Sequence, residues 1–566
     1  MRLPRQASTL LRIDLTTVIR LDDTAGRIHA TISQCSDMQH FIKSQCGNAD
    51  FFCLRFHTVL KYHLSINTLH PSPWTRPAAS ICDGRDVLRS SGIANDNKMS
   101  TFATVVNFTA VKNLCNMKFY DRTEQIQELQ DIRKQAFEKH STLTVVTGRR
   151  RIGKTTLIEK AMGEGAYVYF FVGKKSEAIL CSEYADEIRT KLGIFVPSGI
   201  ASFKDIFALL MEAGTSRQFT LVIDEFQNFM DVNDSVYSDI QNFWDKYRLK
   251  SHINMIVCGS VYSLMEELFK NRKEPLYGRC DHTIRLEPFS PEVMKEIIHD
   301  HYPEYSNDDL LALYTYTGGV PKYIELLVDA EALSKESIIN YIAKQDSPFI
   351  EEGRRLLIQE FGKKYATYFS ILQAISEGYN TQAEISDYLG SKSIGGQLLK
   401  LEEIYNLIRK NRPMWAGSKT QTVKYEIGDI FLRFWFRYIE KNQQLIEINQ
   451  YPLLRKIISS DYETYSGDIL ERYFRAKLIE SMKYRAIGNW WDSKGYTDKK
   501  GNRQQCEIDI IAIHIDDKEA DIFEVKRNAD KFRSNLLQEK ISHLKEKEKR
   551  IRKYNLHFAC LSIEDM

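Results

Sequence analysis

From about residue 117 onward, short apolar runs alternate with amphipathic segments of helical period. Near-continuous apolar runs rich in β-branched and aromatic residues occur at 143–147, 167–173, 219–223 and 254–260 and near residue 284. Runs of this kind are typical of parallel strands that are buried on both faces, and helical stretches separate all of them. The pattern predicts an α/β domain over residues 117–285, with a parallel sheet covered by helices on both faces.

The first helix of this domain is predicted directly after residue 120. Apolar side chains recur there at helical spacing, at Ile126, Leu129 and Ile132. Asp121 or Thr123 is the predicted N-cap, because both residue types accept hydrogen bonds from the free amides of a first helical turn.

Residues 1–116 have a different character. Hydrophobic periodicity is patchy there, lysine is scarce, and five of the ten cysteines lie in this stretch. It is either a small accessory domain or upstream sequence translated from a start codon that is placed too early. We favour the second interpretation, because no convincing core pattern is present.

Further along, the pattern predicts three helices with a hairpin within residues 356–445. The second of these three helices begins with a capping box, formed by Thr381 and Glu384. This order resembles a winged helix-turn-helix. The third helix offers few cations for DNA, so a wing that contacts protein is favoured over one that reads DNA. The aromatic run at 431–442 is predicted to be core.

Composition and charge restrict the class of protein. A chain of 566 residues with 43% hydrophobic residues predicts three or four folded domains. The 78 basic and 75 acidic residues give a net charge of +3, which excludes a histone-like polycation. No apolar run approaches the roughly 18 residues of a membrane helix, and the cysteines form no CxxC pair. We expect a cytoplasmic protein with reduced thiols and no membrane partner.

The clearest chemical motif is a phosphate-binding loop that follows the first strand. Gly148 and Gly153 frame the loop, and Lys154 and Thr155 complete the pattern G-x-x-x-x-G-K-[ST]. The glycines let the chain curl so that main-chain amides point at phosphate oxygens, Lys154 neutralises phosphate charge, and the Thr155 hydroxyl binds Mg²⁺. The predicted nucleotide-binding residues are therefore Gly148, Arg149, Arg150, Arg151, Ile152, Gly153, Lys154, Thr155 and Thr156.

A second motif agrees with the first. The apolar run 219–223 ends in Asp224 and Glu225, at the edge of the sheet where ligands bind in α/β proteins. Asp224 is predicted to hold Mg²⁺ and Glu225 to polarise the water that attacks ATP. Ser260, at the end of the next apolar run, is either a sensor of the γ-phosphate or a simple helix cap.

Several motifs together resemble one known family. FYDRTEQIQEL, GRRRIGKTTLI, LVIDEFQNF, PLYGR, LEPFSP and TGGVPKYIELL occur in the order seen in archaeal-type ATPases, an AAA-like group of signal-transduction ATPases. The resemblance runs from about residue 117 to the C-terminus. It implies that Arg279 is an arginine finger or state sensor, with a structural arginine as the alternative. It also implies that residues 286–355 form a helical lid in which Pro321 approaches the nucleotide, with a plain helix-breaking loop at Pro321 as the alternative. The three arginines at 149–151 are expected to be exposed, where they could meet a partner or nucleic acid.

The C-terminal region, residues 446–566, contains a second constellation. QQCEIDIIAIHIDDKEADIFEVKRN predicts two strands joined by a tight turn at 516–519. Pairing Ile515 with Ala520 places Asp509 opposite Lys526, and puts both on one face with Glu524. Two carboxylates and a lysine at this spacing can hold Mg²⁺ and activate a water against a phosphodiester.

This pattern resembles the PD-(D/E)XK nuclease fold, a restriction-endonuclease-like α/β domain. The resemblance implies that Glu471 supplies the helical glutamate of such folds. Residues 526–553 contain 11 Lys or Arg against 4 Asp or Glu, which gives +7 and could track a phosphate backbone. A nuclease-like domain without activity is the alternative.

The sequence thus predicts an ATPase, with ATP and Mg²⁺ as ligands, whose nucleotide state repositions a C-terminal nuclease-like module. One alternative is a Mg²⁺-dependent DNA endonuclease regulated by ATP. Another is a slow nucleotide switch that assembles with a protein partner or with further copies of the chain. The sequence does not distinguish ATP from GTP or identify the partner.

Overall fold

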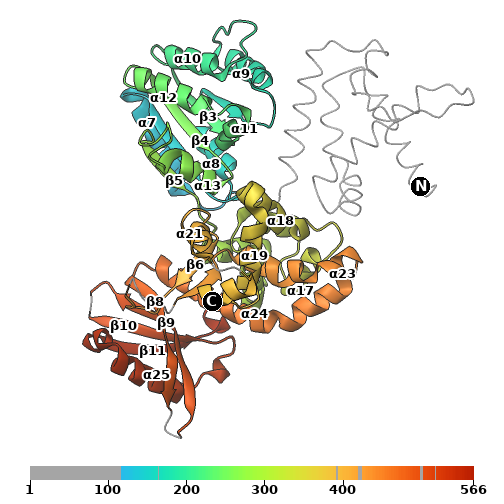
Figure 1. The fold of residues 1–566 in the computed structure, drawn as a ribbon, viewed down its shortest axis with the longest axis vertical. Coiled ribbons are helices and arrows are strands. Elements are labelled where there is room, and N and C mark those ends of the chain that lie inside the picture. The colour runs from blue at the N-terminus through green and yellow to red at the C-terminus, as the bar shows by residue number, and fades with distance from the viewer. Residues whose placement is uncertain (1–116, 164, 391–392, 418–422, 498–500, 517) are drawn as a thin grey trace, which may run out of the picture. The chain divides into compact units, whose positions relative to one another are not determined.

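The computed structural model describes residues 117–566 except 164, 391–392, 418–422, 498–500 and 517 (Figure 1). Residues 117–566 form one compact unit. The N-terminal stretch 1–116, with both interpretations of it, lies outside the described residues. Within the described part of the chain, no helix is both long enough and apolar enough to cross a bilayer.

The first sheet has five parallel strands, as predicted. The strands are β1 (Thr142–Thr147), β2 (Tyr167–Phe171), β3 (Gln218–Asp224), β4 (His252–Cys258) and β5 (His282–Arg285), in the order β2-β3-β4-β1-β5. All four pairings are parallel. β4 therefore lies between β1, which leads into the phosphate loop, and β3, which carries the acidic pair.

Helices cover both faces of this sheet because its central strands are apolar on both sides. They are α7 (Thr123–Glu138), α8 (Lys154–Met162), α9 (Glu177–Leu192), α10 (Phe203–Ala213), α11 (Phe229–Val232), α12 (Val236–Tyr247) and α13 (Tyr262–Lys270). On β1, Val145 packs in the cluster that contains α9, α10 and α12, whereas Val146 packs with α7 and α8. The predicted cap of α7 is wrong. The N-cap is Arg122 in a left-handed conformation, and no side chain caps the helix.

The segment predicted to be the lid is helical, and the lid comprises residues 286–361, because α18 continues past the predicted boundary at 355. It contains α14 (Pro291–His301), α15 (Asn307–Thr317), α16 (Pro321–Asp329), α17 (Lys335–Ile342) and α18 (Pro348–Phe361). α15 begins with a capping box between Ser306 and Asp309. Its hydrophobic side chains belong to one cluster with the elements that follow it, so the lid and the next segment share a core.

Three helices and a hairpin follow the lid in the predicted order. They are α19 (Tyr365–Ser376), α20 (Gln382–Tyr388), α21 (Gly395–Glu403), β6 (Ile408–Asn411) and β7 (Lys424–Ile427), and the two strands are antiparallel. The capping box of Thr381 and Glu384 is present at the start of α20. The aromatic run forms α22 (Ile430–Phe434) and a π-helical turn (Trp435–Ile439), and it is core as predicted.

The C-terminal region contains α23 (Gln443–Glu447), α24 (Tyr451–Glu480), β8 (Tyr484–Thr497), β9 (Arg503–His514), β10 (Glu519–Val525), α25 (Ser534–Lys547) and β11 (Asn555–Leu561). The sheet order is β11-β10-β9-β8. β8, β9 and β10 form an antiparallel meander, and β11 returns after α25 to lie parallel to β10.

The predicted register of β9 and β10 is wrong by two residues. Ala520 pairs with Ile513 rather than with Ile515. Ile515 lies in the turn and is exposed, so an apolar residue that looks like the end of a strand is part of the loop. Extending the observed register by one pair places Asp509 opposite Glu524. Asp509, Glu524 and Lys526 therefore still share one face of the sheet, as predicted.

Candidate functional site

The segment between β1 and α8 curls tightly, as a phosphate loop requires. Gly148, Arg151 and Gly153 all have positive φ, at 148°, 67° and 90°. A Cβ atom on Gly148 would lie 2.8 Å from the main-chain oxygen of Leu286, so only glycine fits there. Lys154 is the first residue of α8, with its side chain folded into the curl. Its Nζ donates to the main-chain oxygens of Gly148 at 2.9 Å and Arg149 at 3.2 Å.

The predicted metal-binding pair, Thr155 and Asp224, is brought together at the C-terminal edge of the sheet. The Thr155 hydroxyl donates to Oδ2 of Asp224 at 2.9 Å. Tyr169 donates to the same oxygen at 2.5 Å, and the thiol of Cys258 donates to Oδ1 at 3.0 Å. Hydroxyl and carboxylate oxygens are the ligands that Mg²⁺ prefers, so this pair fits that ion.

Tyr169 and Cys258 orient Asp224, and sequence analysis did not single them out. Each lies at or near the end of a strand adjacent to β3, on the side of the sheet that faces the loop. Burial, followed by the charge of Asp224, raises the pKa of both the Tyr169 phenol and the Cys258 thiol. Both groups therefore remain protonated and act as donors to the carboxylate.

Glu225 follows Asp224 with a left-handed backbone, at φ 54°. Its Oε2 accepts from the Ser260 hydroxyl at 2.7 Å and from Nε2 of Gln227 at 2.5 Å. Ser260 is not a helix cap, because the N-cap of α13 is Val261. Non-glycine residues in this conformation often occur at functional sites, where the surrounding contacts hold the strain.

The three loop arginines are not free to meet a partner, which corrects that expectation. Arg149 is bonded to Asp429, the N-cap of α22, and Arg150 donates to Gln359 of α18. Nε of Arg151 lies 2.8 Å from Oε1 of Glu352, also in α18. The lid and the segment before α22 supply acceptors for these side chains, and spacing along the sequence does not reveal such long-range pairs.

Glu360 of α18 is a site residue that sequence analysis missed. It accepts from the amide of Tyr262 at 3.1 Å and from the Ser263 hydroxyl at 3.2 Å, at the start of α13. Burial raises the pKa of Glu360 to about 7, and the nearby charge of Lys154 opposes the rise. A lid carboxylate that titrates near neutral pH therefore lies within electrostatic range of the phosphate loop.

The GxP motif also reaches the loop. α16 begins at Pro321, and the amide of Lys322 lies 3.4 Å from the main-chain oxygen of Arg151. Gly319 has a φ of 76°, and a Cβ there would lie 2.4 Å from the main-chain oxygen of Phe289. The motif therefore holds the start of this lid helix against the loop.

Arg279 is not brought to the phosphate loop. Its guanidinium is bonded to Asp245 of α12, with NH2 2.7 Å from Oδ2, and to the main-chain oxygens of Pro275 and Tyr277. It precedes β5, whose first residue, His282, pairs with Thr144 near the start of β1. The loop follows the other end of β1, so Arg279 lies at the opposite edge of the sheet.

A cavity of about 380 Å³ borders the first half of the loop. It is lined by Gly148, Arg149 and Arg150, by the segment 285–291 after β5, and by residues of the lid that include Gly318 and Glu360. This volume is within the range of cavities that bind small molecules.

The second predicted constellation is also assembled. Nζ of Lys526 lies 3.0 Å from Oε1 of Glu524 and 3.6 Å from Oδ2 of Asp509. Lys540 of α25 donates to both oxygens of Glu524, at 2.9 and 3.1 Å. The amide of Val525 donates to Asp509 at 2.8 Å. Among the described residues, no three acidic, histidine or cysteine side chains meet closely enough to form a metal site alone.

Charges in this cluster perturb one another. Burial, followed by the charge of Glu524, raises the pKa of Asp509. Burial would lower the pKa of Lys526, but Asp509 and Glu524 outweigh it and the net direction is up. Burial, with Asp509 second, raises the pKa of Glu471 to about 7. The charge of Asp509 thus acts on Glu471 of α24, whose own ion pair is with Arg475 at 3.0 Å.

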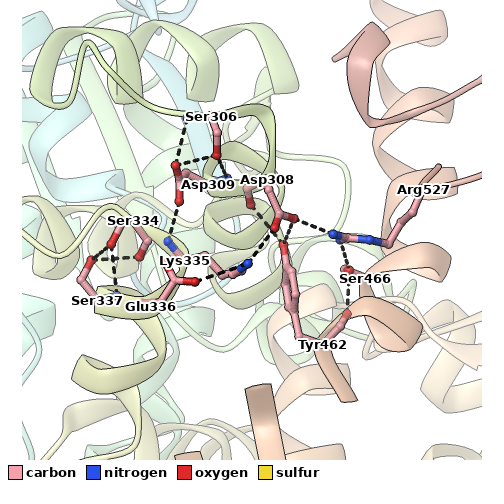
Figure 2. A network of polar contacts seen from close by, with 10 residues as sticks. All are labelled: Ser306, Asp308, Asp309, Ser334, Lys335, Glu336, Ser337, Tyr462, Ser466 and Arg527. Carbon is pink, nitrogen blue, oxygen red and sulfur yellow. Dashed lines mark hydrogen bonds and ion pairs between the residues drawn. The ribbon is translucent and has the colours of Figure 1, made fainter. Parts of the chain in front are cut away.

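The residue after Lys526 joins this cluster to the lid. NH2 of Arg527 lies 2.8 Å from Oδ1 of Asp308 in α15, and NH1 donates to the Ser466 hydroxyl at 2.6 Å (Figure 2). Asp308 also accepts from Tyr462 of α24 at 3.0 Å and from Lys335 of α17 at 3.0 Å. One carboxylate thus binds three elements together, two of them distant in sequence.

Comparisons with known proteins identify two regions. Residues 119–327 match the family described as an ATPase domain predominantly from Archaea, and residues 435–543 match archaeal and bacterial proteins of unknown function. An uncharacterised protein of Methanocaldococcus jannaschii is 30% identical over 419 residues, which cover 72% of this chain and 87% of that protein. An uncharacterised ATP-binding protein of the same organism is 24% identical over 332 residues, covering 48% of this chain and 83% of the relative.

Solved structures give a more distant likeness. The Walker-type ATPase of Pyrococcus abyssi has a TM-score of 0.42 at 19% identity, covering 57% of this chain and 99% of that one. The Aeropyrum pernix ORC2 protein, in ADPNP–ADP complexes, has a TM-score of 0.42 at 14% identity, covering 59% of this chain and 98% of that one.

Proposed function

We propose that this chain, which belongs to the archaeal-type ATPase family, binds ATP at the loop Gly148–Thr155 and hydrolyses it with Mg²⁺. The observation that carries the proposal is the 2.9 Å contact between Thr155 and Asp224, with Lys154 inside the curled loop beside them. A bound triphosphate needs an ammonium group and a divalent cation to neutralise its charge. Lys154 would supply the ammonium group, and Thr155 and Asp224 would hold the cation.

Each residue of the site has a role that its present contacts support. The main-chain amides of the loop and the N-terminus of α8 would bind phosphate oxygens. Lys154 would exchange its two main-chain acceptors for phosphate oxygens. Thr155 and Asp224 would hold Mg²⁺, which neutralises charge on the β- and γ-phosphates when bound. The cavity beside Gly148 would hold the nucleoside.

Glu225 is the proposed base that orients and deprotonates the attacking water. Ser260 and Gln227 now occupy one of its oxygens. A γ-phosphate would compete for the Ser260 hydroxyl and release Glu225, which is how Ser260 would sense the nucleotide. Removing the carboxylate in Glu225→Gln should keep ATP binding and stop turnover.

We assign Arg279 no role in the nucleotide site of its own chain. Its distance from the loop along the sheet favours the structural alternative, in which it fixes α12 to the segment before β5 through Asp245. If the chain forms a ring or dimer, Arg279 of one copy could instead meet the nucleotide of the next. Arg279→Ala, assayed for ATP turnover at increasing protein concentration, separates these two roles.

The same proposal extends to the C-terminal region as a module repositioned by ATP. Three ion pairs support it. Two of them join the phosphate loop to later parts of the chain, Arg149 to Asp429 next to the hairpin and Arg151 to Glu352 in the lid. The third, Arg527 to Asp308, joins the C-terminal region to the lid. A phosphate in the loop changes the electrostatic environment of the first two arginines, and the lid carries the third contact. Limited proteolysis with and without ATP tests whether this region changes its exposure.

A second function is favoured by the carboxylate cluster. The order α24-β8-β9-β10-α25-β11, with β11 parallel to β10, supports a PD-(D/E)XK-like domain. The three helices and hairpin before it support a winged helix. We propose that Asp509 and Glu524 hold Mg²⁺ and that Lys526 orients a water at a phosphodiester. Loss of Mg²⁺-dependent DNA cleavage in Asp509→Ala tests this, and cleavage that persists would reject the site.

A further inference from the structure

A polar cavity of about 430 Å³ lies between the hairpin β6–β7, helix α24 and strands β8 and β9. Neither the nucleotide site nor the carboxylate cluster accounts for it. Its most prominent feature is six cationic side chains, namely Arg409, Lys424, Arg433, Arg437, Arg472 and Arg475.

These cations are incompletely neutralised. Four carboxylates line the same cavity, Glu426, Asp468, Glu471 and Glu507, and a fifth, Asp461, lies 2.7 Å from Arg437, which leaves an excess of one positive charge. Two guanidinium groups, those of Arg472 and Arg433, converge on the carboxylate of Glu426, and Arg433 also lies 3.8 Å from the exposed Asp468.

Arg472 is a largely buried cation of this cavity. Its side chain is only 11% exposed, and it donates to the main-chain oxygens of Gly428 and Ile427 at 3.1 and 3.2 Å. Burial, followed by the charge of Arg433, lowers the pKa of Arg472 to about 10. Arg472 and Arg433 share the carboxylate of Glu426, and buried like charges are costly unless anions compensate them, so an anionic ligand in the cavity would stabilise this pair.

The cavity adjoins the carboxylate cluster through α24. Arg475 lines the cavity and donates to the main-chain oxygen of Asp509 at 3.3 Å. Glu471, one turn earlier, also lines it, and the charge of Asp509 acts on it. An anion in the cavity would therefore lie next to the residues proposed to cleave a phosphodiester.

We propose that this cavity binds the phosphodiester backbone of a single nucleic-acid strand. Binding of the strand requires only the cations of the cavity. Cleavage of the bound strand rests on the proposed nuclease-like function. A cavity of this volume suits a nucleotide-sized unit rather than a duplex. Each of its three aromatic rings has a cation over it, Lys424 over Trp491, Lys410 over Tyr425 and Arg437 over Tyr465, so we expect phosphate contacts without base stacking.

The test compares two double variants of the full chain. Arg409→Gln/Lys424→Gln removes two cavity cations that are exposed or half-exposed. Lys441→Gln/Lys456→Gln removes two exposed lysines outside the cavity, and is the matched control. Both variants should retain the thermal unfolding midpoint of the wild type. The probe is a fluorescein-labelled oligothymidylate of about 20 nucleotides, longer than the usual site size, measured by anisotropy in EDTA.

We expect the cavity variant to bind the strand at least tenfold more weakly than the wild type. Its slope of log Kd against log salt should fall by about 1.4, because each lost phosphate contact contributes about 0.7. The control should match the wild type. Equal affinities for the two variants would overturn the proposal, and so would a wild type that binds thymidine monophosphate but not the strand.

Binding and cleavage can fail separately in this design. Asp509→Asn in the same assay should bind the strand at least as tightly as the wild type, since all the cavity cations remain and one neighbouring negative charge is removed. If strand binding holds and cleavage never occurs with Mg²⁺, the cavity assignment stands and the nuclease proposal falls.

Discussion

The guanidinium of Arg149 in the phosphate loop is bonded to the carboxylate of Asp429, 280 residues further along the chain. Asp429 also caps α22, accepting from the amide of Leu432 at 2.9 Å. Glu426, three residues earlier, binds Arg472 and Arg433 in the cationic cavity. One short segment therefore contacts both the nucleotide loop and the cavity, which gives the ATP site a direct route to the C-terminal region.

Removing the Asp429 carboxylate should strongly destabilise the protein. Asp429→Ala leaves Arg149, whose side chain is only 19% exposed, without its carboxylate partner and removes the helix cap. We expect a loss of about 3–5 kcal/mol in the free energy of unfolding from the unpaired charge and about 1 kcal/mol from the cap. Urea unfolding measures both. Asp429→Asn, which keeps an oxygen for the cap, should lose about 1 kcal/mol less than Asp429→Ala, and equal losses would contradict the capping role.

Lys154→Ala should weaken ATP binding by at least about 100-fold, because no other ammonium group lies inside the loop. Fluorescence titration with a labelled ATP analogue measures the affinity. Lys160→Ala is the matched control, since Lys160 is exposed in the same helix. Comparable affinities for the two variants would show that the loop does not bind the triphosphate as proposed.

Glu360 should make stability depend on pH around neutrality. Its pKa is about 7 in the folded chain against an ordinary 4.5, so folding favours the protonated form. The destabilisation is absent below pH 4.5, grows as pH rises, and is complete above pH 7. Glu360→Gln should thus be about as stable as the wild type at pH 5 and more stable at pH 8, by up to roughly 3 kcal/mol.

Chemical unfolding at the two pH values checks this prediction. Glu212→Gln, at an exposed glutamate, is the control and should show no such difference. The free energies of unfolding of Glu360→Gln and the wild type could instead differ by the same amount at both pH values. Glu360 would then have a purely structural role, as the acceptor for Tyr262 and Ser263.

The contact between Arg527 and Asp308 should couple the lid to the C-terminal region. The pair is 2.8 Å apart, and each side chain is less than a quarter exposed. A double-mutant cycle with Arg527→Ala and Asp308→Ala should give a coupling energy of about 1–2 kcal/mol. The exposed pair of Lys134 and Glu138 in α7, 4.0 Å apart, is the reference and should give at most about 0.5 kcal/mol. Equal coupling energies in the two cycles would show that the Arg527–Asp308 contact does not couple the lid to the C-terminal region.

The sequence predicts the local parts of this structure well. The five parallel strands, the lid helices and the capping box at Thr381 follow from hydrophobic period and capping chemistry, which act over a few residues. Thr155 meets Asp224 because both follow strands that end at the same edge of the sheet. These features need no knowledge of distant contacts.

The sequence does not predict the contacts between distant elements. Asp429, Glu352 and Glu360 carry no motif. The folded lid brings Glu352 and Glu360 to the loop, and the turn between β7 and α22 brings Asp429. The register of β9 and β10 was missed because Ile515 extends the apolar pattern into the turn, where its amide bonds to Lys483 instead of continuing the ladder. Arg279 matched a motif, but its bonds to Asp245 hold it at the far edge of the sheet.

ATP turnover by Glu225→Gln tests the central claim most directly. Mg²⁺-dependent phosphate release and ATP affinity should be measured together on the wild type, on this variant and on Glu212→Gln. The account predicts turnover in the wild type and in Glu212→Gln, with ATP bound but phosphate release at least about 100-fold slower in Glu225→Gln. Turnover that persists undiminished in Glu225→Gln, or a wild type that binds no ATP, would contradict it.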